Sequence, residues 1–348
     1  MSLPDPSAAR KPNRWPLYAP FLILLAAAMA WSGVWVWERG RALTALDAAQ
    51  ASWRTAGYQL AWKSRSIGGY PFRLDVSLTD VSLREPSGWA LLAPRVEAEA
   101  FAYAPTHWLI AATEGLTFVR PRGGAVSVSG DLIRASLSNP DALPPSLSFE
   151  GVKLHFQTPA GARPFGLTTA DRVEFHLRAG PDDEGGVFAT VTNGKARPSS
   201  LFGRITGDRP VSLDWNATTS KMSGFGGRDW AEGVRRWTAG GGRMTVRKGS
   251  LTLGEARIAV NSGTLGAGAD GRLTGALDVS LRQAPRVLGA LEDDGVIAPE
   301  TAQGAKVVIQ AGQSGQGDIA HATINFLAGR TTLGPVAVGP APPIYTPD

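Results

Sequence analysis

Hydrophobic and polar residues follow three different patterns along the chain, and the first is an uninterrupted apolar run. From Trp15 to Trp37 the sequence WPLYAPFLILLAAAMAWSGVWVW contains no charged residue. At about 1.5 Å per residue, a helix of this length spans the roughly 30 Å hydrocarbon core of a bilayer. Tryptophans stand near both ends, as in the aromatic belts of membrane interfaces. The run therefore predicts a transmembrane helix over residues 15–37.

The charges that flank this run predict its orientation. Arg10, Lys11 and Arg14 precede it, and a mixed Glu-Arg-Gly-Arg segment follows it. Because basic residues concentrate on the cytoplasmic side, we expect residues 1–14 to form a cytoplasmic tail and the body to lie outside the cytoplasm.

A cleaved signal peptide is the alternative interpretation of the same run. Ala28-Met29-Ala30 resembles a small-x-small cleavage site. The apolar run continues through Trp37, well beyond that site, which favours an uncleaved anchor.

The second pattern is helical. Apolar residues recur at the spacing of one helix face: Ala42, Ala45 or Leu46, Ala49 and Trp53. Gly57 follows as a helix stop. Residues 38–57 therefore predict a stalk helix that continues the membrane helix.

The third pattern is alternation, which is typical of β-strands. It starts with Tyr58, Leu60 and Trp62, and resumes with Phe72, Leu74, Val76 and Leu78. Gly68-Gly69 supplies the positive φ of a tight turn between the two runs, and Pro71 suits a strand start. This stretch predicts a β-hairpin. At Thr79-Asp80 the apolar phase shifts by one residue, which predicts a β-bulge.

Alternation continues over most of the remaining chain. The clearest runs cover residues 96–103, 116–119, 125–137, 147–156 and 173–177, and helical patterns are confined to 229–238, 284–291 and 299–304. Links of hairpin length predict an antiparallel meander without βαβ units. The expected fold class is mainly β (α+β): a transmembrane helix and a stalk helix, then a long curved antiparallel β-sheet with a few packed helices. We divide the body into regions 58–222 and 223–348.

The second of these regions carries a faint repeat and a predicted apolar face. GSLTLG at 249–254 matches GRTTLG at 329–334, which indicates a repeated strand–turn–strand unit. Between the two copies and after them, alternating apolar residues are expected to share one face of the sheet: Leu273, Leu277, Val279, Leu281, Ile324 and Phe326.

Composition removes several classes of function. The 348-residue chain has no cysteine, which excludes disulfides, thiolate catalysis and Cys-bound zinc. Its net charge is +5 and the longest basic cluster of the body is Arg235-Arg236, so no nucleic-acid partner is predicted. Hydrophobic content of 43% is that of a folded protein.

Motifs of catalysis are nearly absent. Gly266–Gly271 (GAGADG) fits a dinucleotide-binding spacing, but the alternating RLTGALDVSL that follows predicts a hairpin loop instead. The sequence has no Gly-x-Ser-x-Gly, His-Glu-x-x-His or Walker motif. Four scattered histidines and two acidic pairs are interpreted as surface residues: His107, His155, His176, His321, Asp182-Asp183 and Asp293-Asp294. We therefore expect no enzyme activity, no catalytic residue, no cofactor and no metal site.

The segment GGYPFRLDVSLTDVSL, directly after the anchor and stalk, resembles a family of bacterial envelope proteins catalogued as domain of unknown function 2125. Its matching residues form a motif: Gly69, Tyr70, Pro71, Phe72 and Arg73. Residues 235–281 and 324–345 resemble, more distantly, the C-terminal unit of AsmA-like and YdgA-like proteins. The resemblance implies a protein that hangs in the periplasm from one inner-membrane helix, with an AsmA-like curved sheet and an apolar groove.

Two functions from different classes follow. The first is a non-enzymatic, inner-membrane-anchored periplasmic protein whose apolar sheet face binds lipid acyl chains, with the six residues of the predicted apolar face as the lipid contacts. The alternative is a structural or interaction protein of the envelope whose core is filled by the predicted helices. We expect Tyr70 and Phe72 to pack the junction between helix and sheet, which is a structural role.

Overall fold

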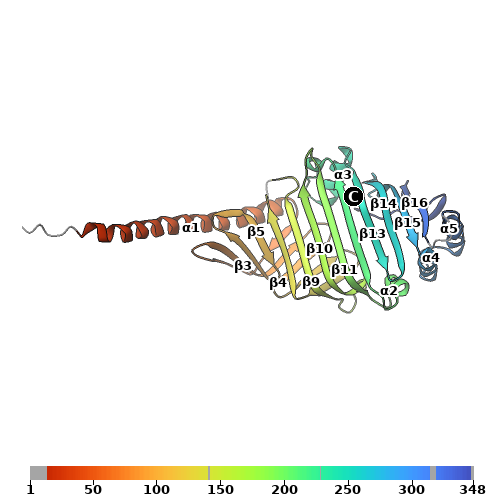
Figure 1. Cartoon of the computed structure of the whole chain (residues 1–348), viewed down its shortest axis with the longest axis horizontal. Helices are drawn as coiled ribbons and strands as arrows, with labels where there is room; N and C mark the ends of the chain where they lie inside the picture. Colours follow the sequence, from red (N-terminus) through yellow and green to blue (C-terminus); the bar gives the residue numbers. More distant parts are fainter. Residues whose placement is uncertain (1–13, 140–141, 228, 314–318, 346–348) are drawn as a thin grey trace, which may run out of the picture.

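A computed structural model describes residues 14–139, 142–227, 229–313 and 319–345. Its described strands form one antiparallel sheet in which neighbours in sequence are mostly neighbours in space. Figure 1 shows a long helix at one end of this sheet and a pair of short helices at the other. The predicted fold class is confirmed: mainly β, with a long apolar helix at the N-terminus and few others.

Helix α1 runs without interruption from Trp15 to Thr55, so the predicted membrane and stalk helices are one helix. The apolar half up to Ala30 is exposed on nearly all sides. From Trp31 onward a half-buried stripe follows the helical period: Trp31, Trp35, Glu38, Ala42, Leu46 and Ala49. The stripe faces the body, and it includes three of the positions predicted from the sequence.

The edge of the sheet beside α1 is capped by side chains of this helix. Gln50 donates to the Leu60 carbonyl at 2.9 Å, and Arg39 donates to the Ile67 carbonyl at 3.4 Å. These carbonyls lie on edge strands, which otherwise expose unpaired backbone groups that can recruit other chains. Helix α1 therefore protects this edge of the sheet.

The predicted first hairpin is present. Strands β1 (Gln59–Ala61) and β2 (Ser64–Gly68) both pair with β3 (Arg73–Arg84), and Gly69 in the turn has φ +96°. The predicted β-bulge at Thr79-Asp80 is absent. Pairing between β3 and β4 (Ala90–Phe101) keeps one register on both sides of Asp80, with no extra residue on either strand. Asp80 instead adopts a left-handed φ of +50°, which shifts the apolar phase without an insertion.

The meander then continues with short strands in its middle and long strands beyond. The strands are β5 (Ala104–Ala111), β6 (Leu116–Arg120), β7 (Gly124–Ser129), β8 (Leu132–Ser138), β9 (Ser146–Gln157), β10 (Leu167–Ala179), β11 (Gly185–Ala196), β12 (Val211–Thr219), β13 (Met244–Leu253), β14 (Ala256–Ala267), β15 (Leu273–Arg282), β16 (Ile319–Leu327), β17 (Arg330–Leu333) and β18 (Val336–Pro340). The single run predicted over 125–137 is two strands, because Gly130 and Asp131 separate β7 from β8. Both copies of the faint repeat are strand–turn–strand units with a glycine of positive φ.

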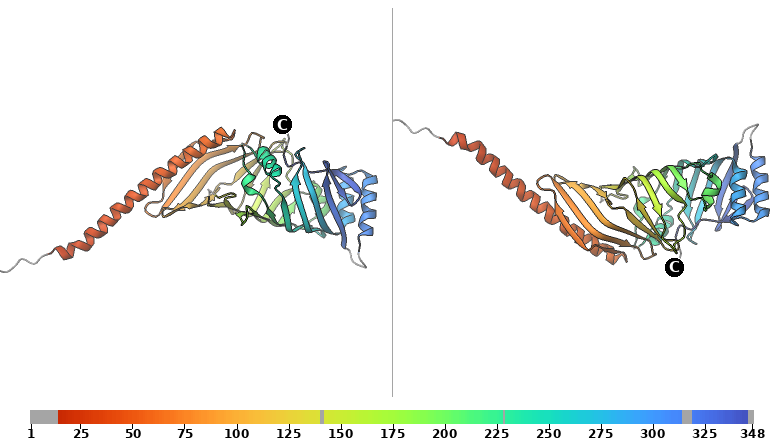
Figure 2. Two further views of the ribbon diagram at one scale, coloured as in Figure 1. Left: turned by 90° about the horizontal axis from the view of Figure 1, so that it is seen from above. Right: turned by 90° about the horizontal axis from the view of Figure 1, so that it is seen from below.

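The short helices cover one face of the sheet. They are α2 (Leu201–Thr206), the 3₁₀ turn η1 (Met222–Gly224), α3 (Trp230–Ala239), α4 (Ala284–Asp293) and α5 (Pro299–Ala311). Figure 2 shows the sheet curved, with α3 near its middle and α4 and α5 at the end far from α1. The sheet is continuous between the two regions 58–222 and 223–348, because β12 of the first pairs with β13 of the second along their lengths.

Candidate functional site

Helix α3 lies over the middle of the sheet and forms the roof of an apolar cavity. Its first turn is capped by Asp229, whose carboxylate accepts the Glu232 N–H at 2.8 Å. Val234 and Trp237 on its lower face are buried, and the Trp237 indole donates to the Ser220 carbonyl at 2.6 Å. That hydrogen bond fixes the large ring above the sheet.

The cavity beneath α3 has a volume of about 450 Å³. We call it the α3 cavity. Its floor is made by strands β10 to β15, and the 143–145 loop closes one side. The lining residues are Leu143, Pro144, Pro145, Phe175, Leu177, Val187, Thr219, Met222, Phe225, Trp230, Val234, Trp237, Met244, Leu265, Gly266, Leu273 and Ile344. Among these described residues none carries a charge, so the cavity offers dispersion contacts and excludes ions.

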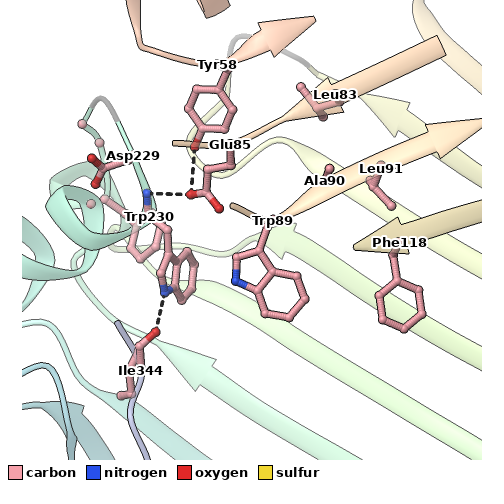
Figure 3. A pocket seen from close by; sticks show the side chains of 14 residues that line it. Tyr58, Leu83, Glu85, Trp89, Ala90, Leu91, Phe118, Asp229, Trp230 and Ile344 are labelled. Carbon is pink, nitrogen blue, oxygen red and sulfur yellow. Dashed lines mark hydrogen bonds between the residues drawn. The ribbon is translucent and has the colours of Figure 1, made fainter. Parts of the chain in front are cut away.

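A second, more open cavity of about 810 Å³ lies beside the first, between the rim of β3 and β4 and the segment that leads into α3. We call it the rim cavity. Phe225, Trp230 and Ile344 line both cavities, so the two meet at these side chains. Figure 3 shows Leu83, Leu91, Trp89 and Phe118 around the rim cavity. Apolar surface is thus continuous from the rim to the cavity under α3.

Glu85 links the rim to the start of α3. Its Oε1 accepts the Trp230 backbone N–H at 3.2 Å and the Tyr58 hydroxyl at 3.5 Å (Figure 3). Partial burial raises the pKa of Tyr58, and the negative charges of Glu85 and Asp229 raise it further. The phenol is therefore neutral at physiological pH and remains a hydrogen-bond donor to Glu85. The Trp230 indole donates to the Ile344 carbonyl at 2.9 Å, which holds the ring between the cavities.

The six residues predicted as lipid contacts do share one face, but they lie mostly in a packed core. Leu277 pairs with Ile324, and Val279 pairs with Ala322. Helices α4 and α5 cover this part of the sheet, and Leu277, Val279, Leu281 and Phe326 are all buried in the cluster beneath them. A cavity of about 130 Å³ lies there, beside Leu281 and Ile324. Of the six, Leu273 alone lines the α3 cavity.

The motif of Gly69 to Arg73 forms the junction with α1, as predicted. The Trp31 indole donates to the Pro71 carbonyl and the Trp35 indole to the Arg73 carbonyl, both at 2.8 Å. Tyr70 lies edge-on to Trp35 with ring centroids 5.4 Å apart. Phe72 lies against Trp31 with ring centroids 6.2 Å apart, and its side chain is nevertheless largely exposed.

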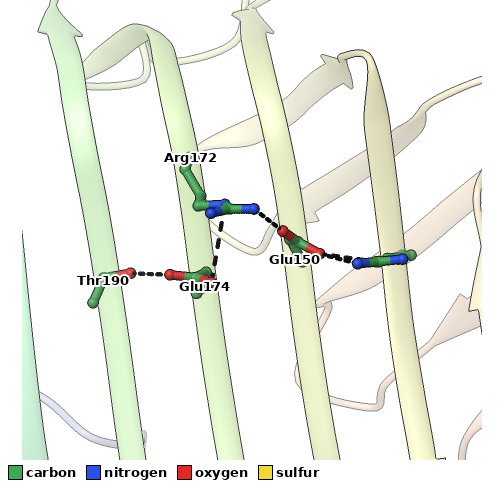
Figure 4. Close-up of polar contacts among 5 residues, drawn as sticks. Glu150, Arg172, Glu174 and Thr190 are labelled. Atoms are coloured by element: carbon green, nitrogen blue, oxygen red, sulfur yellow. Dashed lines mark hydrogen bonds and ion pairs between the residues drawn. The ribbon is translucent and has the colours of Figure 1, made fainter.

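The opposite face of the sheet is polar and carries a ladder of charges (Figure 4). Glu150 on β9 accepts hydrogen bonds from Arg134 on β8, at 2.9 Å and 2.6 Å, and from Arg172 on β10. Glu174 then accepts from Thr190 on β11 at 3.1 Å. Hydrogen bonding from Arg134 lowers the pKa of Glu150. Hydrogen bonding from Arg172 and the positive charges of both arginines lower it further. These residues tie four strands together on the solvent side.

The described part of the chain offers no candidate metal centre. Among residues 14–139, 142–227, 229–313 and 319–345, no cluster of three or more His, Asp or Glu side chains could hold a metal ion. The Gly266–Gly271 segment covers the end of β14 and most of the turn before β15, as the alternation after it indicated. His107, His155 and His321 are exposed on strands, and His176 is half-buried.

Fold and cavities together define a class: a chain with one N-terminal helix long and apolar enough to cross a membrane, followed by a curved antiparallel sheet with apolar cavities. The chain belongs to the family of uncharacterized proteins conserved in bacteria that is termed DUF2125, with the match covering residues 35–342. The match thus begins four residues after Trp31, which contacts the turn before β3. Comparisons with curated proteins and with solved structures found no match.

Sequence reasoning missed the α3 cavity. Its lining comes from segments as distant as Leu143 and Ile344, and no local period reports such contacts. A partial signal existed in the helical pattern of 229–238, with tryptophans at both ends of an otherwise polar stretch. Tryptophans on a short amphipathic helix indicate a large apolar surface to be covered.

Proposed function

We propose that this protein is a non-enzymatic, single-pass protein of the bacterial inner membrane that binds lipid acyl chains beneath α3. The carrying observation is the uncharged α3 cavity of about 450 Å³, which joins the open rim cavity at Trp230. Its volume lies within the range of ordinary ligand pockets, which are about 300–1,000 Å³. A monomeric sheet without a ligand would be expected to fill such a space with side chains.

Acyl chains are the ligand class that this chemistry favours. Each buried methylene contributes about 0.8 kcal/mol and needs no polar partner. A polar or charged ligand would lose its hydration at a lining whose side chains are almost all apolar. The helix that would anchor the protein also places the body next to a source of acyl chains. The loose resemblance of the C-terminal region to AsmA-like proteins agrees with this assignment and remains a prediction.

The second candidate is a structural or interaction protein of the envelope. The packing of α4 and α5 favours it, since Ala302 and Ala305 are fully buried against the sheet and fill that end of the core. The two candidates differ at the α3 cavity: the first requires it to hold a ligand, and the second does not.

The test is mass spectrometry of lipids that copurify with the detergent-extracted chain. Val187 lines the α3 cavity, and Val187→Trp should fill part of it. Thr192→Trp is the matched control, because Thr192 is exposed on the opposite face of the same strand, β11. Lipids around α1 are common to all variants, so the difference between the two variants isolates the cavity.

We expect Val187→Trp to copurify with less lipid per protein than the parent, and Thr192→Trp to match the parent. Equal lipid in all three proteins, each with unchanged thermal melting, would support the structural candidate and contradict acyl-chain binding at this site.

A further inference from the structure

Four exposed aromatic side chains project from adjacent turns at the end of the sheet nearest the exposed half of α1. Tyr70 and Phe72 are 57% and 62% exposed, and Phe101 and Tyr103 are 52% and 66% exposed. The first pair lies in the turn between β2 and β3, and the second at the end of β4 and in the turn that follows it. We call these four residues the aromatic tip.

The two turns of the aromatic tip form one surface. The Ala102 N–H donates to the Phe72 carbonyl at 2.9 Å, so the turns are hydrogen-bonded to each other. Phe101 and Tyr103 stack with ring centroids 5.0 Å apart. Figures 1 and 2 show these turns beside α1, pointing toward its exposed half. A soluble domain rarely leaves several large rings exposed together unless the surface binds something.

The position of the aromatic tip along α1 indicates that the tip contacts the membrane surface. Residues 15–30 are the part of α1 that precedes contact with the sheet, and they extend only about 24 Å at 1.5 Å per residue. A hydrocarbon core of roughly 30 Å needs about 20 residues, so the membrane must reach about residue 34. Trp31 and Trp35, which contact Pro71 and Arg73, therefore lie at the membrane surface.

Charges lie one layer above the tip, where lipid headgroups would be. Arg39 and Arg41 follow the apolar run directly, and the Arg41 guanidinium stacks over the Trp37 ring at 4.8 Å. Arg73 is half exposed beside Asp75 and Glu99. The one acidic residue near this level on α1, Glu38, is buried and contacts Arg41 at 3.3 Å. Aromatic rings below and arginines above match the order of a membrane interface.

We propose that the aromatic tip inserts into the interface of the bilayer that α1 crosses, so that the sheet is attached to the membrane at two places. The inference rests on the anchoring by α1 within the proposed function, but it does not depend on a ligand in the α3 cavity. Tyr and Phe at an interface bury apolar surface while the Tyr hydroxyls stay hydrated. With helix and tip both fixed, the sheet cannot swing freely about α1.

The absence of cysteine from the sequence allows a direct test with the full-length chain. Phe72→Cys and Tyr103→Cys would carry an environment-sensitive fluorophore at the tip. Ser87→Cys is the control, since Ser87 is exposed in the turn at the opposite end of β3. Strand β3 has 12 residues, so the control lies about 40 Å from the tip. Each protein is reconstituted at one copy per lipid nanodisc, which removes contacts between copies.

Lipids that carry a nitroxide near the headgroup should quench the fluorophores at positions 72 and 103 several-fold more than the one at position 87. The water-soluble quencher iodide should give the opposite order. Equal quenching by the labelled lipid at all three positions, in proteins with parental melting behaviour, would overturn the proposal. If Phe72→Cys fails to fold, Tyr103→Cys, which is remote from the α1 contacts, decides the result alone.

Discussion

Gly68 and Gly69 are adjacent in the first hairpin but differ in what they tolerate. Gly69 has φ +96°, and a Cβ there would lie 2.7 Å from the Arg73 carbonyl oxygen. Gly68 has an ordinary backbone in β2 and open space around it. Gly69→Val should therefore reduce the free energy of unfolding by on the order of 2 kcal/mol, by strain and steric overlap.

Gly68→Val is the matched control and should change that free energy by less than about 0.5 kcal/mol, because a strand accepts valine. Chemical denaturation of both variants would measure the difference. Equal stability of the two would mean that the turn is not built as described.

Glu150 provides a prediction of pH dependence. Its pKa is lower in the folded protein than in the unfolded chain, so the folded state binds fewer protons there. Its stabilising effect is complete above the unfolded pKa of about 4.3 and is lost as the pH falls through the folded pKa. Glu150→Gln should remove this part of the acid dependence and cost less than about 1 kcal/mol at neutral pH, since both arginines are half exposed.

Denaturation curves between about pH 3 and pH 7 would measure this effect. Glu97→Gln is the control for charge removal, because Glu97 has one arginine partner, Arg95, at 2.9 Å. A parent and a Glu150→Gln variant with the same pH dependence would contradict the account of the ladder.

At the scale of single residues, the sequence predicted contacts that lie within one motif. Gly69 in the turn and Tyr70 at the junction follow from local chemistry, because a glycine pair and an aromatic beside a strand start have few arrangements. The exposure of Phe72 was not predictable, since alternation alone assigns a ring to the core.

Elements with a strong period were predicted within a few residues, and weak ones were not. The pattern over 229–238 corresponds to α3, which begins after its Asp229 cap. Helix α2 has only six residues, too few to show a period, and depends on the burial of Ile205. Strand β11 was not predicted from the sequence, because its glycines carry no side chain that could show the alternation. Asn193, which has φ +49°, also breaks the alternation.

Helices α4 and α5 are predicted to be a rigid plug. Ala305 on α5 is fully buried against the sheet, whereas Val307 on the same helix is exposed. Ala305→Leu should destabilise the fold by about 1–3 kcal/mol through overpacking, and Val307→Leu should be nearly neutral. Thermal melting of both variants measures this, and a neutral Ala305→Leu would indicate a loose end of the core that can open.

For the whole molecule, the orientation of α1 is the first prediction. The basic residues before the apolar run favour a cytoplasmic N-terminus. Alkaline phosphatase fused after Asp348 should be active, and a fluorescent protein that folds only in the cytoplasm should be dark at the same site. The reverse pattern would place the sheet in the cytoplasm and remove the basis for a periplasmic function.

The global shape was predictable as a class but its cavities were not. Short links and alternation imply a meander, and curvature follows from the natural twist of strands. The short helices cover one face of the sheet, and their positions decide which part of that face is left with a cavity. Leu277 looked as available as Leu273 in the sequence, but α5 and α4 cover the first and leave the second at the α3 cavity.

Photo-crosslinking on β10 and β15, which both line the α3 cavity, tests acyl-chain binding most directly. A photo-reactive residue would replace Leu273 or Leu177 in the α3 cavity, Leu277 beneath the plug, or Asp278 on the polar face. Irradiation of the full-length protein in its native membrane, followed by mass spectrometry, should find lipid adducts at Leu273 and Leu177 and none at Leu277 or Asp278. Adducts at none of the four positions, or equal adducts at Asp278, would contradict the proposal that the cavity beneath α3 holds acyl chains.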